Sequence, residues 1–308
     1  MVIGGAEDKL KDKVILSRFV KLSGGAGGGI VVISTASSLG DAATEVYGAL
    51  FGQMGSGPVT GIRPLTREEA NDPEMASALD DATGVFLTGG NQLRLASAVG
   101  GTLVGKAVVA AHHRGAVIAG TSAGASALAT HMMAFGQSGA IPKHRMAQMS
   151  AGLGIVADIV VDQHFEQRTR LGRLLAVVAQ SPALLGLGVD EDTAAVIYAD
   201  HTLEVIGRGV VTIVDGTNMI TDAFQTKGFR PMMVSGAVLH SLPSGFRFDI
   251  SNRTLIPPVT VLKDRVATRA EAAGRRLRRM AREMAAEGAD SFVIDRRRRR
   301  GAEPEASE

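Results

Sequence analysis

The stretch Val117-Ile-Ala-Gly-Thr-Ser-Ala-Gly124 decides the fold, and an alanine-rich run to Ala129 follows it. Its first residues are apolar and partly β-branched, which predicts a buried strand over Val117–Ala119, and the alanines predict a helix over Ala123–Ala129. The junction fits the pattern G-x-S-x-G, in which small residues let strand and helix approach while the serine is held in a strained turn with its hydroxyl exposed. A packing turn without chemistry fits the same residues.

Three other apolar runs have the character of buried strands: Ile30–Ile33, Val85–Leu87 and Ile159–Val161. Each is followed by a turn and then a helical pattern. Because strands that alternate with helices pair in parallel under helices on both faces, the sequence predicts an α/β fold, a three-layer sandwich with a largely parallel central sheet. Residues 194–262 differ, since closely spaced strand candidates there are typical of an antiparallel edge: Ala194–Ala199, Leu203–Ile206 and Gly209–Val214.

Several helices are also predicted. Thr66 and Glu69 have the spacing of a capping box, which places a helix over Glu68–Leu79. Helical patterns also cover Gln92–Val99, Glu166–Gln180 and the charged segment Asp264–Glu287.

The chain shows no linker or internal repeat, so we expect a single hydrolytic domain over residues 1–288 and a charged, disordered tail over 289–308. The tail contains the basic run Arg296–Arg300. Nucleic-acid binding is not expected there, because no aromatic residues are interleaved with the arginines for base stacking.

Composition excludes several classes of protein. The 308 residues include no Cys, which rules out disulfides, a thiolate metal site and a cysteine nucleophile. The net charge is only +2, and 45% hydrophobic residues suffice for a large core. The N-terminus lacks the basic and apolar regions of a secretory signal, and no apolar stretch is long enough to cross a bilayer. We therefore expect a cytoplasmic protein with no membrane contact.

Polar residues follow four predicted strands. In α/β sheets the loops at the carboxyl ends of strands bind ligands, so we expect these residues to converge on one edge of the sheet. They are Thr88-Gly-Gly-Asn-Gln92 after Val85–Leu87, Ser122 after Val117–Ala119, Asp162-Gln-His164 after Ile159–Val161, and Asp190-Glu-Asp192 after Leu184–Val189.

A serine nucleophile at position 122 needs a base, and histidine suits neutral pH. Of the seven histidines, only His164 directly follows a predicted parallel strand, although a purely structural histidine fits that position too. The acid that orients the histidine has three candidates in the run Asp190–Asp192, and strand alternation puts Glu191 on the side opposite its neighbours. The residues alone do not choose among them.

Backbone amides near Ser122 are candidate oxyanion donors. The predicted helix that begins after Ser122 presents free N–H groups, and Thr88-Gly-Gly90 offers others, although a plain turn before the next helix fits this tripeptide equally.

Three arginines follow His164: Arg168, Arg170 and Arg173. Cations near a helix N-terminus oppose the helix dipole, so something anionic should compensate. Internal pairing with Asp162, Glu166 or Asp190 is one explanation. Binding of substrate carboxylates by the guanidinium groups is the other, and it suggests an aspartyl peptide as substrate.

Three stretches closely resemble the cyanophycinase family: Gly120-Thr-Ser-Ala-Gly-Ala-Ser126, Asp162-Gln-His-Phe-Glu-Gln-Arg-Thr-Arg-Leu-Gly-Arg-Leu-Leu175 and Leu187-Gly-Val-Asp-Glu-Asp-Thr193. Supporting stretches include Val2–Lys9 and Phe86–Gln92, and the resemblance covers about residues 1–262. More distantly, the chain is similar to peptidase E and to class I glutamine amidotransferase-like folds. It departs from the family pattern at Asn91, where an acidic residue is more usual.

The resemblance implies a serine peptidase that hydrolyses cyanophycin to β-Asp-Arg dipeptides through an acyl-enzyme, as a homodimer without cofactor or metal. It implies a triad of Ser122, His164 and Glu191, and oxyanion donors near Gly90 and Ala123. It also implies a set of substrate contacts: Gln92, Asp162, Gln163, Arg168, Arg170 and Arg173. The alternatives are a peptidase for other Asp-containing or isoaspartyl peptides and a non-catalytic binding protein on the same fold.

Overall fold

Most of the predicted strands lie in a mixed sheet within residues 1–256, the part of the chain that this computed structural model describes. Its parallel strands are β1 (Val2–Ile3), β2 (Ile30–Ile33), β3 (Val59–Ile62), β4 (Gly84–Leu87) and β5 (Val117–Thr121). Its antiparallel strands are β10 (Thr193–Ile197), β11 (Thr202–Gly207), β16 (Arg247–Asp249) and β17 (Thr254–Ile256). Within the described range the order is β17-β16-β11-β10-β1-β5-β4-β2-β3, so β1 joins the parallel half to the antiparallel half.

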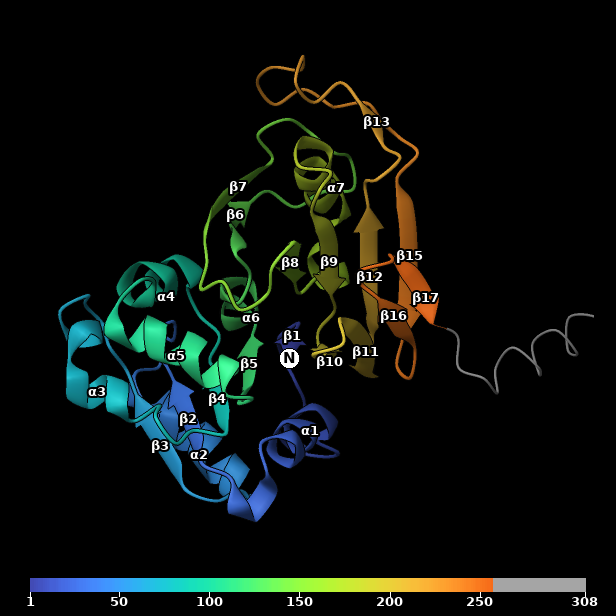
Figure 1. The fold of residues 1–308 in the computed structure, drawn as a ribbon. Helices are drawn as coiled ribbons and strands as arrows, with labels where there is room; N and C mark the ends of the chain where they lie inside the picture. Colours follow the sequence, from blue (N-terminus) through green and yellow to red (C-terminus); the bar gives the residue numbers. More distant parts are fainter. Residues whose placement is uncertain (257–308) are drawn as a thin grey trace, which may run out of the picture. The chain divides into compact units, whose positions relative to one another are not determined.

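Helices cover both faces of the parallel strands (Figure 1). They are α1 (Val14–Leu22), α2 (Asp41–Gln53), α3 (Pro73–Ser77), α4 (Gln92–Val99) and α5 (Leu103–His113). Alternation along β2 divides the core: Val31 and Ile33 pack in the cluster with α3, α4 and α5, whereas Ile30 and Val32 pack with α1 and α2. Because both faces are buried, the strands β2 and β4 are continuously apolar, which is why their sequence signal was clear.

A second sheet of four strands lies within the described residues, in the order β15-β12-β9-β8. Its strands are β8 (Ile159–Gln163), β9 (Leu185–Val189), β12 (Val210–Asp215) and β15 (Val238–Pro243), and only β8 and β9 pair in parallel. Helix α7 (Leu171–Gln180) packs on this sheet through Leu174, Val177 and Val178. Two hairpins complete the fold: β6 (His131–Gly136) with β7 (Ala147–Ala151), and β13 (Ile220–Thr221) with β14 (Val234–Ser235).

The expectation that four strand ends share one edge of one sheet is therefore wrong. The ends of β4 and β5 belong to the first sheet, and those of β8 and β9 belong to the second. Strand β8 cannot pair with β5, because β4 and β1 occupy both sides of β5. The predicted strand Gly209–Val214 likewise joins the second sheet, whereas the strands near Ala194–Ala199 and Leu203–Ile206 form an antiparallel pair as predicted.

Two predicted helices are interrupted. In place of Glu68–Leu79 the chain forms the 3₁₀ turn η2 (Glu69–Asn71) and then α3, because Pro73 has no N–H for a continuous helix. Thr66 does cap Glu69, with Oγ1 3.2 Å from the Glu69 nitrogen. In place of Glu166–Gln180 the chain forms η3 (Glu166–Arg168) and α7, separated by Thr169, whose φ of 49° is left-handed.

The remaining predictions concern termini and membranes. The predicted helix Asp264–Glu287, the tail 289–308 and the end of the predicted domain 1–288 lie outside the described residues. Within residues 1–256, no single helix is long and apolar enough to cross a bilayer. Helices α4 and α5 reach that length and composition only together, and they are bent by 95° at their junction.

Candidate active site

Ser122 occupies the sharp turn between β5 and α6 (Ala123–Ala127). Its φ of 52° and ψ of −112° are the strained conformation that the G-x-S-x-G pattern predicts. The flanking glycines are required by close packing: a Cβ on Gly120 would lie 2.4 Å from the Gly124 carbonyl, and one on Gly124 would lie 2.3 Å from the Leu87 oxygen. The turn thus holds its half-buried serine in a fixed orientation at the end of β5.

A chain of hydrogen bonds connects Ser122 with His164 and Glu191. The Ser122 Oγ lies 2.9 Å from His164 Nε2, and His164 Nδ1 lies 2.6 Å from Glu191 Oε1. With the proton on Nδ1, the imidazole donates to Glu191 and accepts from the serine hydroxyl; this tautomer is assigned from the hydrogen-bond network. The serine comes from the first sheet, and the other two residues follow β8 and β9 of the second.

The three acids of the run 190–192 have different partners. Asp190 accepts the backbone N–H groups of Glu166 and Val210, at 3.0 Å each. Asp192 accepts the N–H of Asp8 at 2.8 Å and pairs with Arg208 at 3.2 Å. Glu191 alone of the three contacts the imidazole.

The end of β1 and the two glycines that follow it align these loops. The carbonyl oxygens of residues 3, 4 and 5 accept the backbone N–H groups of Ser122 (3.0 Å), His164 (2.9 Å) and Asp192 (2.9 Å) respectively. Gly5, with a φ of 101°, lies directly against the imidazole, since a Cβ there would be 2.4 Å from His164 Cε1. This role of residues 3–5 was not predicted; a strand of two residues gives too little periodicity to detect.

The surroundings of His164 favour its neutral form. Burial lowers the pKa of His164 below its usual value, and the positive charges of Arg168 and Arg170 act in the same direction, whereas Glu191 acts to raise it. The net result is a lowered pKa. An imidazole that is neutral at pH 7 is suited to accept a proton from Ser122.

Two free amides border the serine turn. Within residues 1–256, the N–H groups of Gly90 and Ala123 donate no hydrogen bond. Gly89 packs on the serine, because an added Cβ would lie 3.3 Å from Ser122 Cβ. Gly90 has a φ of 140°, and a Cβ there would overlap the Ala36 oxygen at 1.9 Å. Close packing against Ala36 thus excludes a side chain at Gly90, which directly follows the glycine that packs on Ser122.

Of the predicted substrate contacts, four form a buried cluster. Asp162 pairs with both Arg170 and Arg173, and its Oδ2 lies 2.6 Å from Arg173 Nε. Arg170 also donates to the backbone and side-chain oxygens of Gln163. All four are at most 6% exposed, and burial lowers the pKa of Arg170 to about 10. Of the two explanations for the arginines, internal pairing thus applies to Arg170 and Arg173.

The other two predicted contacts are more accessible. Gln92 is half-buried and donates its amide to the carbonyls of Met133 (3.3 Å) and Ala134 (2.7 Å) on β6. Arg168 is exposed, and its side chain makes no hydrogen bond or ion pair within the described range. It is therefore the one arginine of the three that is open to a ligand.

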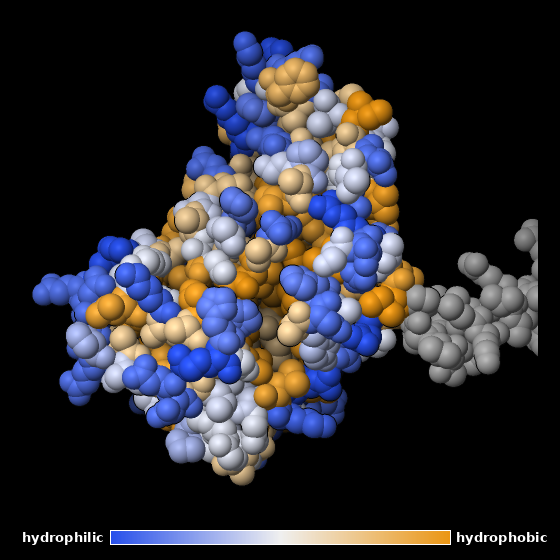
Figure 2. Space-filling model, viewed as in Figure 1, coloured by the Kyte–Doolittle hydropathy of each residue, from blue (hydrophilic) through white to orange (hydrophobic). Residues whose placement is uncertain are grey.

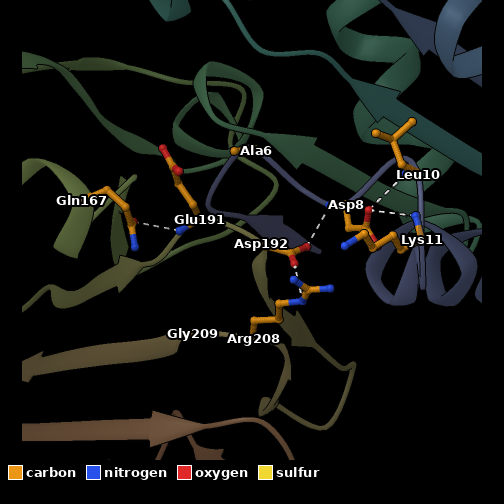
Figure 3. A pocket seen from close by; sticks show the side chains of 9 residues that line it. All are labelled: Ala6, Asp8, Leu10, Lys11, Gln167, Glu191, Asp192, Arg208 and Gly209. Carbon is orange, nitrogen blue, oxygen red and sulfur yellow. Dashed lines mark hydrogen bonds and ion pairs between the residues drawn. The ribbon is translucent and has the colours of Figure 1, made fainter.

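A cavity of about 540 Å³ opens beside Glu191 (Figure 3). Its lining includes Lys11, Gln167 and Arg208, and Gln167 accepts the backbone N–H of Glu191 at 2.9 Å. The Glu191 side chain is 37% exposed. On the face drawn in Figure 2, apolar surface gathers towards the middle of the molecule between more polar margins. No group of three or more potential metal ligands occurs among the described residues.

Comparisons with known proteins identify the family. The model of "Peptidase family S51" matches residues 1–206. The chain belongs to this family. It is 39% identical over 262 residues to a cyanophycinase of Trichormus variabilis, with 84% of this chain and 88% of that protein covered. It is 38% identical over 251 residues to a cyanophycinase of Geminocystis herdmanii, with 81% and 92% covered.

The family and the fold agree with the sequence predictions. As a member of peptidase family S51, the chain is a serine-type hydrolase. A solved peptidase from an acI-B1 Actinobacterium has the same fold, with a TM-score of 0.59, 21% identity, and 80% of this chain and 94% of that one covered. The predicted α/β fold, class I glutamine amidotransferase-like with a mostly parallel centre, is confirmed.

We expect Gly5→Ala to slow acylation of Ser122 by roughly 100-fold, because the new methyl displaces the imidazole. The measurement is the rate of covalent labelling by a small serine-directed acylating probe, followed by mass spectrometry. Gly115→Ala is the matched control: its φ of 97° gives similar backbone strain, but nothing lies within 4 Å of the added Cβ. Equal labelling rates in the two variants would contradict the steric role of Gly5.

Asp162→Asn should lower the free energy of unfolding by about 3–5 kcal/mol, because it leaves two buried guanidinium groups without their anion. Urea denaturation measures this. Asp12→Asn, which breaks an exposed pair with Arg208, is the control and should change stability little. A stable Asp162→Asn protein would show that the buried arginines have another counter-charge.

Labelling of Ser122 should fall with decreasing pH, with a midpoint below about 6.5, because the neutral His164 is the active form and its pKa is lowered. Arg168→Gln should move this midpoint upward, since removing a cation stabilises the imidazolium. Raised salt should shrink the difference between the two proteins. Arg247→Gln, on the distant strand β16, serves as control; an unchanged midpoint in Arg168→Gln would refute the electrostatic coupling.

Proposed function

We propose that this chain is a serine exopeptidase that hydrolyses cyanophycin, a poly-aspartate with arginine on each β-carboxyl, to β-Asp-Arg dipeptides. The observation that carries the proposal is the hydrogen-bonded series Ser122–His164–Glu191. Its support is the match to cyanophycinases over more than four-fifths of both chains.

In the proposed mechanism, the Ser122 hydroxyl attacks the scissile carbonyl while His164 Nε2 takes its proton. Glu191 holds the Nδ1 proton and stabilises the imidazolium that forms. The negative oxygen of the tetrahedral intermediate accepts hydrogen bonds from the free amides of Gly90 and Ala123. His164 then protonates the leaving amine, and the acyl-enzyme is hydrolysed by a water molecule that His164 deprotonates.

We assign different roles to the remaining site residues. Arg168 is exposed beside His164, so we propose that it binds carboxylates of the substrate. Arg170 and Arg173 are both paired with Asp162 and act as the rigid support of this region, together with Gln163. Gln92 borders the Gly90 turn, where its side-chain oxygen is available to a peptide N–H of the substrate.

Homodimer formation and a cytoplasmic location stay predictions that rest on the resemblance and on composition. Light scattering of the purified protein measures the first.

Ser122→Ala should reduce release of β-Asp-Arg from purified cyanophycin by a factor of about 1,000 or more. The measurement is chromatographic assay of the dipeptide, with circular dichroism as the control for folding. Release that survives in this variant would overturn the mechanism. Failure of the folded wild type to release any dipeptide would overturn the substrate.

A further inference from the structure

Glu7 is a buried carboxylate that the catalytic series does not contain. It lies four residues after the end of β1 and is 3% exposed. Three donors from different segments reach it: Thr121 Oγ1 at 2.6 Å, the Tyr47 hydroxyl at 2.5 Å and Lys9 Nζ at 2.8 Å. Thr121 bonds Oε2, whereas Tyr47 and Lys9 bond Oε1. Each carboxylate oxygen of Glu7 thus bonds a different set of donors.

The donors favour the ionised form of Glu7. Burial acts to raise its pKa, but the charge of Lys9 and the hydrogen bonds from Lys9, Thr121 and Tyr47 act to lower it, and the net direction is downward. Hydrogen bonds to an ionised acceptor are roughly twice as strong as those between neutral groups. The hydrogen bond from Thr121 to Glu7 is therefore a strong contact that fixes the end of β5.

Thr121 directly precedes Ser122, the residue with the strained backbone. Such a conformation persists only where neighbouring contacts over-determine it. On one side the Ser122 N–H is bonded to the Ile3 carbonyl, and on the other the Thr121 side chain is bonded to Glu7. In the same N-terminal segment, the Gly4 carbonyl accepts a hydrogen bond from the His164 N–H. Residues 3–7 therefore fix the serine turn relative to the histidine loop.

We propose that Glu7 is a positioning residue that acts through Thr121 to hold the Ser122 hydroxyl within hydrogen-bond distance of His164. This inference deepens the proposed function and rests on Ser122 being its nucleophile. Tyr47, on helix α2, bonds the other oxygen of the same carboxylate and therefore offers a matched control. Removing the Tyr47 hydroxyl weakens the buried cluster without releasing the serine turn.

The experiment compares Thr121→Val, Thr121→Ser and Tyr47→Phe in the full chain. Two readouts are taken: the rate of Ser122 acylation by the serine-directed probe, and kcat and KM for release of β-Asp-Arg. We expect Thr121→Val to lower the acylation rate and kcat at least about tenfold with little change in KM, because the serine is misplaced for chemistry. Thr121→Ser keeps the donor and should stay within about twofold of the wild type.

Tyr47→Phe should lower the melting temperature but leave kcat and the acylation rate of the folded protein unchanged. Thr121→Ala provides a second version of the hydroxyl deletion should the valine variant lack a native circular dichroism spectrum. Wild-type acylation in the folded hydroxyl-deletion variant, or an equal loss of kcat in Tyr47→Phe, would overturn the inference.

The two readouts separate this inference from the proposed substrate. A wild type that is acylated at Ser122 but releases no dipeptide refutes cyanophycin as substrate, while slower acylation of Thr121→Val still supports the role of Glu7. Ser122→Ala, which should take up no label, confirms that the probe reports on this serine.

Discussion

The arrangement of the site depends on three consecutive backbone carbonyls, those of residues 3–5. They accept hydrogen bonds from Ser122, His164 and Asp192, which lie in three loops from two separate sheets. The end of β1 and the two glycines after it therefore do what a shared sheet edge does in a simpler α/β fold. They set the spacing between the serine turn and the loops that carry the histidine and the glutamate. Side-chain bonds of 2.9 Å and 2.6 Å depend on that spacing, because neither bond tolerates a shift of an ångström.

This close approach explains the glycines of the N-terminal segment. A Cβ on Gly4 would lie 1.9 Å from the Asp190 oxygen, and one on Gly5 would overlap the imidazole. At Gly4 and Gly5, the backbone can approach these loops only because no side chain intervenes. Glu7 comes two residues after Gly5, and its carboxylate accepts a hydrogen bond from Thr121, the residue before the serine. Residues 3–5 thus contribute main-chain hydrogen bonds, and Glu7 contributes a side-chain hydrogen bond.

The contrast between local and non-local signals explains which parts of the fold were predictable. The strands at Ile30–Ile33 and Val117–Ala119 are continuous apolar runs, so their burial and the serine turn could be predicted from adjacent residues. The separation of the second sheet from the first could not be predicted in this way. It depends on the pairing of β1 with β5, which joins residues more than 110 positions apart. The break at Pro73 was visible in the sequence, whereas the left-handed Thr169 had no such signal.

The choice of acid and the roles of the arginines were non-local in the same way. Glu191 could be separated from its neighbours only by where Asp190 and Asp192 find their partners, at Val210 and Arg208. Likewise, Asp162 pairs with two of the three nearby arginines, whereas Arg168 is exposed. The arginines matter for the histidine, because the charges of Arg168 and Arg170 both lower the pKa of His164 while Glu191 raises it.

The buried Asp162 cluster therefore has an electrostatic consequence beyond its packing. By pairing with Arg170 and Arg173, Asp162 offsets part of the local positive charge that lowers the basicity of His164. A base must be neutral before the reaction and still basic enough to take the serine proton, so both too little and too much positive charge would be unfavourable. In the proposed mechanism, burial, Arg168 and Arg170 supply the first condition, and Glu191, at 2.6 Å from Nδ1, supplies the second by stabilising the imidazolium as it forms.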